Sequence, residues 1–226
     1  LKSVYNGENV ALIPGSGTMG MESVARQFAT RKPAMVLRNG YFSYRWSEID
    51  EWENITDQLT VIKAEYDAKT RRVHPPSLSN VIWQINKIKP AVFFMPHVET
   101  SVGLLLQDDY ITAIGEAVHA NGGLVVLDGI AAGSLWVDMR KLGVDVYITA
   151  PQKSWTSPAG LGIVILGKLA VEKLGSTKGT SFSLDLKKWI EVSDAYTNGG
   201  FAYHTTVPTD TILAFRDAIK ETLELG

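Results

Sequence analysis

Seven short apolar runs, each bounded by turn residues, recur along this chain of 226 residues and mostly alternate with helical patterns. Several runs are apolar on consecutive residues, as in residues 91–95, which indicates a β-sheet covered on both faces. Alternating strands and helices predict a mostly parallel sheet with right-handed crossovers. The predicted strands are residues 9–13, 34–37, 59–64, 91–95, 124–128, 144–149 and 162–166.

The links between these runs predict an α/β fold of three layers, α/β/α, around a seven-stranded mixed sheet. The last strand follows a short Pro158-Ala159-Gly160 turn, which fits an antiparallel hairpin better than a crossover. Beyond about residue 175 the pattern becomes helical, with a polar loop over 196–208. We expect residues 1–226 to form one large domain. The predicted helices are 20–30, 44–52, 77–87, 110–121, 136–142 and 211–225.

The composition fits a globular enzyme and excludes several other classes. A hydrophobic fraction of 45% and a net charge of −2 argue against disorder and against a basic nucleic-acid surface. There is no cysteine, and the four histidines are too widely spaced for a local zinc motif, so we expect no metal site. No apolar stretch approaches the ~18 residues of a membrane span, and we expect a cytoplasmic protein.

Two polar residues stand at the ends of neighbouring apolar runs. Asp128 ends the run 124–128, and Lys153 follows the run 144–149. An aspartate and a lysine in these positions suit pyridoxal phosphate, because the amine forms a Schiff base and the carboxylate keeps the pyridine nitrogen protonated. Each has a simpler interpretation: Asp128 as a turn former before Gly129, and Lys153 as a solvated surface group.

The turn Pro14-Gly15-Ser16-Gly17-Thr18 links the first strand to a helix. Its glycines allow a close approach to an anion, the helix start offers free N–H groups, and Ser16 and Thr18 add hydroxyls. Small glycine-rich turns are also common without any ligand. The segment is not a P-loop, because no Gly-Lys-Ser/Thr follows, and its glycine spacing fits a dinucleotide-binding turn poorly.

Three further segments carry less information by themselves. Residues 96–101 end the fourth strand either as a capped turn or as donors of a hydroxyl to a ligand. Residues 39–43 offer an aromatic for stacking on a flat ring, although aromatics there are more often core. Residues 203–206 lie in a predicted loop between helices and indicate nothing alone.

Taken in order, these segments resemble the class V, fold-type I pyridoxal-phosphate aminotransferases, in particular the alanine–glyoxylate or serine–pyruvate branch. The resemblance covers nearly the whole chain. It rests on Gly15-Ser16-Gly17-Thr18 with Glu22, Asn39-Gly40 with Phe42 and Arg45, His97 with Glu99-Thr100-Ser101 and Gly103, Asp128, Gln152-Lys153, Ser181-Phe182 with Leu184-Asp185, and Tyr203-His204-Thr205-Thr206 with Pro208.

The resemblance implies a role for each matched residue. Lys153 would be the Schiff-base lysine and the proton carrier, and Asp128 the partner of the ring nitrogen. Phe42 and Ile130 would pack on the two ring faces, and Thr100 would bond near the ring oxygen. The residues implied to hold the phosphate are Ser16, Gly17, Thr18 and Gln152, with Tyr203 and Thr206 reaching the phosphate of the neighbouring subunit in a homodimer.

Some positions depart from the family pattern. Phe42 stands where tryptophan is frequent, Val98 replaces a glycine, and Pro151 replaces a small polar residue. The resemblance implies an amino-terminal segment and a small carboxy-terminal domain, both of which we expect to be missing from residues 1–226. That domain carries the arginine that binds the substrate carboxylate, and Arg45 matches a different position.

The expected function is therefore transfer of an amino group from a small amino acid, such as alanine or serine, to a small 2-oxo acid, such as glyoxylate or pyruvate. Two alternatives remain open. The chain could catalyse another reaction on the same cofactor, as a lyase or a phosphonate transaminase. It could also be a truncated domain that binds pyridoxal phosphate without turnover.

Overall fold

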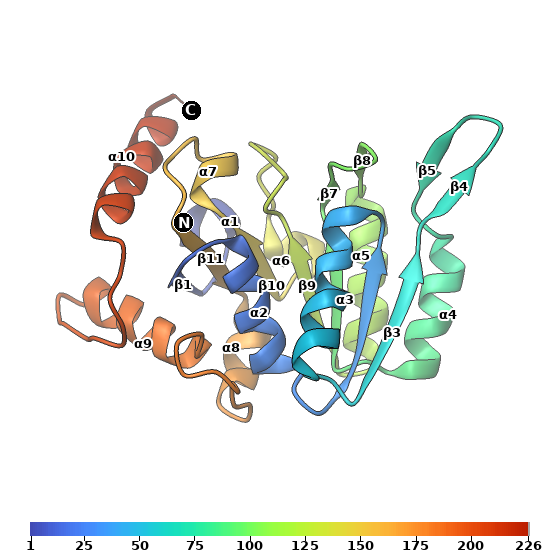
Figure 1. The fold of residues 1–226 in the computed structure, drawn as a ribbon, viewed down its shortest axis with the longest axis horizontal. Helices are drawn as coiled ribbons and strands as arrows, with labels where there is room; N and C mark the ends of the chain where they lie inside the picture. The colour runs from blue at the N-terminus through green and yellow to red at the C-terminus, as the bar shows by residue number, and fades with distance from the viewer. Residues whose placement is uncertain (226) are drawn as a thin grey trace.

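A computed structural model describes residues 1–225 and contains one central seven-stranded sheet (Figure 1). Six strands are parallel to one another, and β11 is antiparallel to its neighbours β1 and β10. The sheet is thus mixed, as predicted, and all seven strands lie within a few residues of the predicted runs. In spatial order the strands are β1 (Asn9–Pro14), β11 (Leu161–Leu166), β10 (Val146–Thr149), β9 (Leu124–Asp128), β6 (Val92–Pro96), β2 (Pro33–Arg38) and β3 (Gln58–Lys63).

Helices pack on both faces of the sheet, which confirms the three layers. Buried side chains alternate along the strands: Val125 and Leu127 of β9 face one core, and Leu124 and Val126 face the other. The first core is closed by α1 (Lys2–Tyr5), α4 (Leu78–Ile88), α5 (Asp108–Ala120), α6 (Met139–Leu142) and α10 (Thr209–Leu225), and the second by α2 (Gly17–Phe28), α3 (Tyr41–Glu53), α8 (Lys168–Leu174) and α9 (Leu186–Thr197).

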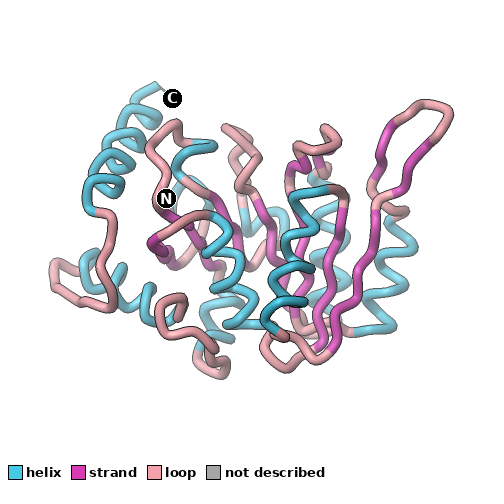
Figure 2. Tube along the Cα trace, viewed as in Figure 1, coloured by secondary structure: helices cyan, strands magenta, loops and turns pink. Residues whose placement is uncertain are grey.

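The carboxy-terminal part is helical, as expected from about residue 175. Helices α9 and α10 lie beyond the β1 side of the sheet, and a long loop joins them (Figure 2). Within residues 1–225, no helix combines the length and the apolar character needed to cross a membrane.

The structure adds short elements that the periodicity did not indicate. Two small hairpins form from β4 (Glu65–Asp67) with β5 (Arg72–His74) and from β7 (Val98–Glu99) with β8 (Leu104–Leu105). The β4–β5 hairpin projects beyond the sheet next to β3 (Figure 1). Strands of two or three residues are too short to show an alternating pattern, so sequence periodicity cannot find them.

The prolines after the run 144–149 predict a loop that holds Lys153 with Pro151, Trp155 and Pro158, and this prediction is wrong. Residues Pro151–Ser154 form a single helical turn, α7, directly after β10. Proline suits the first position of a helix because it lacks the N–H that would be unpaired there. Pro151 therefore starts this helical turn, and Lys153 is its third residue.

Candidate active site

Asp128 and Lys153 follow adjacent parallel strands at the same edge of the sheet. Asp128 is the last residue of β9 and pairs in register with Ile148 of β10. Strand β10 ends at Thr149, and α7, which carries Lys153, begins two residues later. Both residues line one cavity of about 190 Å³. In open α/β sheets, ligands bind at this carboxyl edge of the strands.

The cavity gathers most of the residues that the sequence indicated. Its lining includes Ser16, Gly17, Thr18, Phe42, Thr100, Asp128, Ile130, Gln152 and Lys153. Tyr203 and Thr206 do not line it and are exposed in the loop between α9 and α10. Sequence reasoning assigned no site role to four other lining residues, Met21, Arg45, Val98 and Ala131. Arg45 carried part of the family resemblance but received no role, although its position three residues after Phe42 puts the two on the same side of a helix.

Asp128 forms the buried wall of this cavity. Its side chain is 8% exposed, and Oδ1 accepts one hydrogen bond from the Ile130 N–H at 3.0 Å. Burial, and to a smaller extent the negative charge of Glu99, raise the carboxyl pKa to about 6 against the lowering effect of that bond. Among residues 1–225, no cation pairs with Asp128 within 4 Å. A protonated ring nitrogen placed here would stabilise the charged carboxylate.

The glycine-rich turn offers unpaired donors to the cavity. Helix α2 begins at Gly17, and within the described chain the N–H groups of Gly17 and Thr18 have no acceptor. The Ser16 hydroxyl does not cap the helix, since it contacts the sulfur of Met19 instead. Free N–H groups and the positive end of the helix dipole make this helix start suitable for an anion.

Gly17 also has a packing reason to be glycine. A Cβ atom at this position would lie 2.5 Å from Cδ1 of Ile130, so the Ile130 side chain would have to move to admit any other residue. The turn and Ile130 therefore pack directly against each other on one side of the cavity. This contact joins the first strand–helix unit to the segment that follows β9.

Phe42 is positioned by a buried carboxylate from another segment. Glu99 is fully buried, and its oxygens accept hydrogen bonds from the N–H groups of Phe42 at 3.1 Å and Ser43 at 2.8 Å. The hydroxyls of Ser43 and Ser101 donate to it at 2.7 and 2.6 Å. Burial raises the pKa of Glu99, but these hydrogen bonds outweigh burial and lower the pKa overall. Glu99 thus accepts hydrogen bonds from N–H groups at the start of α3 that have no partner within the helix. It thereby holds Phe42, which is 46% exposed, at the rim of the cavity.

We expect Glu99→Gln to reduce the free energy of unfolding by about 1–3 kcal/mol, because an amide replaces a buried charged acceptor of several hydrogen bonds. Urea denaturation at neutral pH measures the change. Since the folded pKa of Glu99 is lowered, its stabilisation is present above the unfolded pKa and is lost as the pH falls through the folded value. The difference in the free energy of unfolding between wild type and variant should therefore shrink in acid.

Glu51→Gln is the control, because Glu51 is an exposed residue of α3. Its free energy of unfolding should stay within about 0.5 kcal/mol of the wild-type value. Equal midpoints for wild type and Glu99→Gln would contradict this role.

A larger depression of about 610 Å³ lies beside β2, β3 and β4. Its lining includes Arg38, Lys63 and Glu65 but neither Asp128 nor Lys153. The smaller cavity is the better candidate for an active site, because the acid, the amine and the free N–H groups meet there.

Comparison with known proteins gives one consistent family. The model of the family described as Aminotransferase class-V matches residues 15–225. The chain is 26% identical over 230 residues to a 2-aminoethylphosphonate–pyruvate transaminase from Vibrio vulnificus, covering 100% of this chain and 58% of that protein. It is 28% identical over 224 residues to one from Syntrophobacter fumaroxidans, covering 95% and 55%. The chain thus spans somewhat over half the length of these curated relatives.

Solved structures show the same fold. A ureidoglycine–glyoxylate aminotransferase from Bacillus subtilis superposes with a TM-score of 0.84 at 24% identity, covering 100% of this chain and 56% of that protein. An alanine–glyoxylate aminotransferase from Nostoc sp. gives 0.82 at 22% identity, covering 100% and 58%. These likenesses confirm the predicted architecture, a large α/β/α domain of the kind found in these aminotransferases.

Proposed function

This chain belongs to the class-V aminotransferases, whose family model matches residues 15–225, and from this premise we propose that it transfers an amino group from a small amino acid to a small 2-oxo acid. Alanine or serine is the proposed type of donor, and glyoxylate or pyruvate the proposed type of acceptor. The support is the arrangement of Asp128 and Lys153 at the ends of adjacent parallel strands, lining one cavity with the start of α2.

The cofactor expected from the sequence, pyridoxal phosphate, is confirmed by the family. The residues of the cavity fit it: a buried carboxylate without a cation, a lysine, and two helix N–H groups without acceptors among residues 1–225. When bound, the cofactor supplies a carbonyl for covalent attachment and a pyridinium ring that accepts electrons from the substrate carbon.

The proposed roles follow from where each side chain lies. Lys153 would hold the cofactor covalently through Nζ, and its amine, once free, would carry the proton at the reacting carbon. Asp128 holds the proton on the ring nitrogen, and Thr100 binds near the ring oxygen. Phe42, at the rim of the cavity, and Ile130, which packs against Gly17, would lie on either side of the ring. The phosphate is held by Ser16, Gly17, Thr18 and Gln152.

The direct test is to locate the covalent bond. The purified protein incubated with pyridoxal phosphate should show a visible absorption band that borohydride removes, and peptide mapping should find the reduced adduct on Lys153. An adduct on another lysine, or none, would contradict the proposal. Loss of the band on adding an amino acid, followed by turnover with a 2-oxo acid, separates an active enzyme from a domain that only binds the cofactor.

A second donor class is an aminophosphonate, and the curated relatives favour it, since those named above are 2-aminoethylphosphonate–pyruvate transaminases. A panel of alanine, serine and 2-aminoethylphosphonate with pyruvate and glyoxylate, scored by identified products, decides between the donors. Turnover with 2-aminoethylphosphonate and not with the amino acids would replace alanine or serine as the donor. A product of elimination would point instead to a lyase.

We also propose a homodimer with shared active sites. Tyr203 is 70% exposed and, with Thr206, lies outside the cavity of its own chain. Both side chains are therefore free to reach the phosphate site of a second copy. Sedimentation equilibrium tests this, and a monomer at the concentrations of the activity assay would contradict it.

A further inference from the structure

We propose that Arg45 is a positioning residue for the cofactor, binding its phosphate group across the gap between α2 and α3. The inference rests on the proposed function and extends it to a residue that the motif left without a role. On this proposal, the positive charge that balances the phosphate comes from Arg45 of the same chain and not from a neighbouring subunit.

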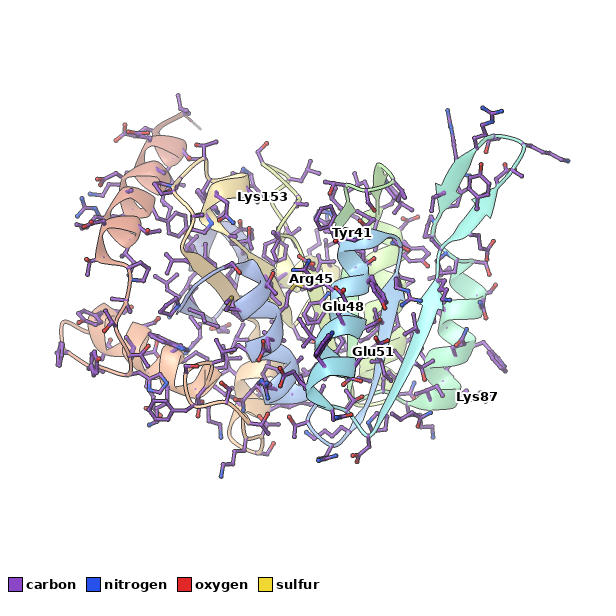
Figure 3. The ribbon with its side chains drawn as sticks, in the orientation of Figure 1. Tyr41, Arg45, Glu48, Glu51, Lys87 and Lys153 are labelled. Atoms are coloured by element: carbon purple, nitrogen blue, oxygen red, sulfur yellow. The ribbon has the colours of Figure 1, made fainter. Side chains whose placement is uncertain are left out.

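Arg45 lies between two parts of the cavity wall. It follows Phe42 by one helical turn on α3 and lines the same cavity. Its Nη1 donates a hydrogen bond to Oγ1 of Thr18 at 3.1 Å, and its Nε lies 3.3 Å from Oε2 of Glu48. Figure 3 shows Arg45 between α2 and α3. Within the described chain the second amino group, Nη2, donates no hydrogen bond, so the guanidinium keeps a free donor beside Thr18.

The charges of the cavity point to the same role. Its described lining contains three ionisable side chains, Arg45, Asp128 and Lys153. Lys153 is needed for the covalent bond, and Asp128 is negative when paired with the ring nitrogen. A phosphate group carries close to two negative charges. Arg45 is then the remaining positively charged side chain in this lining, in addition to the partial charge of the α2 start, and its guanidinium also forms an ion pair with Glu48 at 3.3 Å.

The hydrogen bond to Thr18 also places Arg45 at the end of the cavity where the phosphate is proposed to bind. Thr18 is one of the two residues at the α2 start whose N–H groups have no acceptor among residues 1–225. A guanidinium that bonds its hydroxyl is therefore placed at the phosphate end of the cavity. The competing explanation is structural: Arg45 would only tie α2 to α3 through Thr18.

The two explanations differ in whether the phosphate itself matters. Cofactor-free protein is titrated with pyridoxal phosphate and, in parallel, with pyridoxal, which lacks the phosphate, and binding is followed by absorption. We expect Arg45→Gln to weaken pyridoxal phosphate about tenfold or more while changing the pyridoxal affinity less than about twofold. Arg45→Lys keeps the charge without the planar fork and should retain part of the preference. Arg31→Gln is the control: Arg31 is exposed, lies outside the cavity lining and forms one ion pair, to Asp57 at 3.6 Å. This variant should bind both ligands as wild type does.

Salt gives a second readout that a structural tie would not move. The affinity of wild type for pyridoxal phosphate should fall with ionic strength more steeply than that of Arg45→Gln. Equal losses for both ligands in Arg45→Gln would overturn the inference in favour of the structural tie, and no loss for either would overturn it outright. Failure of wild type to bind pyridoxal phosphate would instead overturn the proposed function, and this inference with it.

Discussion

Replacement of Lys153 by alanine should abolish amino transfer, reducing turnover by at least about a thousandfold. The single Nζ atom is proposed both to bind the cofactor covalently and to carry the proton at the reacting carbon, and alanine can do neither. The variant should also lose the borohydride-sensitive absorption band. Steady-state assays with the best donor–acceptor pair, and the absorption spectrum, measure the two effects. Folding should persist, since Lys153 is exposed.

Lys178→Ala is the matched control, because Lys178 is likewise exposed and lies outside the cavity. It should keep wild-type turnover and spectrum. Turnover by Lys153→Ala near the wild-type rate, or an unchanged absorption band, would refute the assignment of this lysine. Partial recovery with added small amines would support it, since a free amine replaces the missing proton carrier.

Asp128→Asn should have opposite effects on activity and on the stability of the cofactor-free protein. Turnover should fall by roughly 100- to 1000-fold, because a neutral amide no longer holds the proton on the ring nitrogen. Stability at pH 7 should rise, by about 1–2 kcal/mol, because the variant removes a buried charge without a cationic partner within the described chain. The Asn Oδ1 atom can still accept the Ile130 N–H.

The pH dependence follows from the raised pKa. Burial raises the pKa of Asp128 to about 6, against 3.8 for an ordinary aspartate, so the folded protein holds this proton more tightly. Below about pH 4 the carboxyl is protonated in both the folded and the unfolded protein, so it does not affect the free energy of unfolding. As the pH rises from about 4 to 6, the unfolded protein loses this proton more readily, and the free energy of unfolding falls. Urea midpoints of the cofactor-free proteins should converge below pH 4 and diverge above pH 6, with Asp128→Asn the more stable.

Asp210→Asn, an exposed position in the first turn of α10, should show neither the activity loss nor the stabilisation. A destabilised Asp128→Asn at pH 7 would mean that the carboxylate has a favourable partner in the cofactor-free fold. Full activity of the variant would remove Asp128 from the site.

Local sequence patterns were sufficient to predict the order of the strands along the chain and the candidate site residues at the strand ends. Residues 124–128 and 146–149 were recognisable because burial on both faces requires consecutive apolar side chains, whichever partners later cover them. Asp128 and the Gly17 turn each fit an ordinary turn when taken alone. They stood out because they occur together with Lys153, in order, at the ends of predicted strands. Lys153 was found in the same way, although the proline that begins its helical turn was not read as a helix start.

What only the tertiary structure decided are the contacts between segments far apart in the chain. Glu99 caps a helix that begins 58 residues earlier at Tyr41, Arg45 bonds Thr18 across 27 residues, and Ile130 packs on Gly17. No local pattern encodes such pairs, because each residue alone fits a surface or a core equally well. Their partners are set by how helices seat on the sheet, and that packing brought Arg45 into the cavity and left Tyr203 and Thr206 outside it.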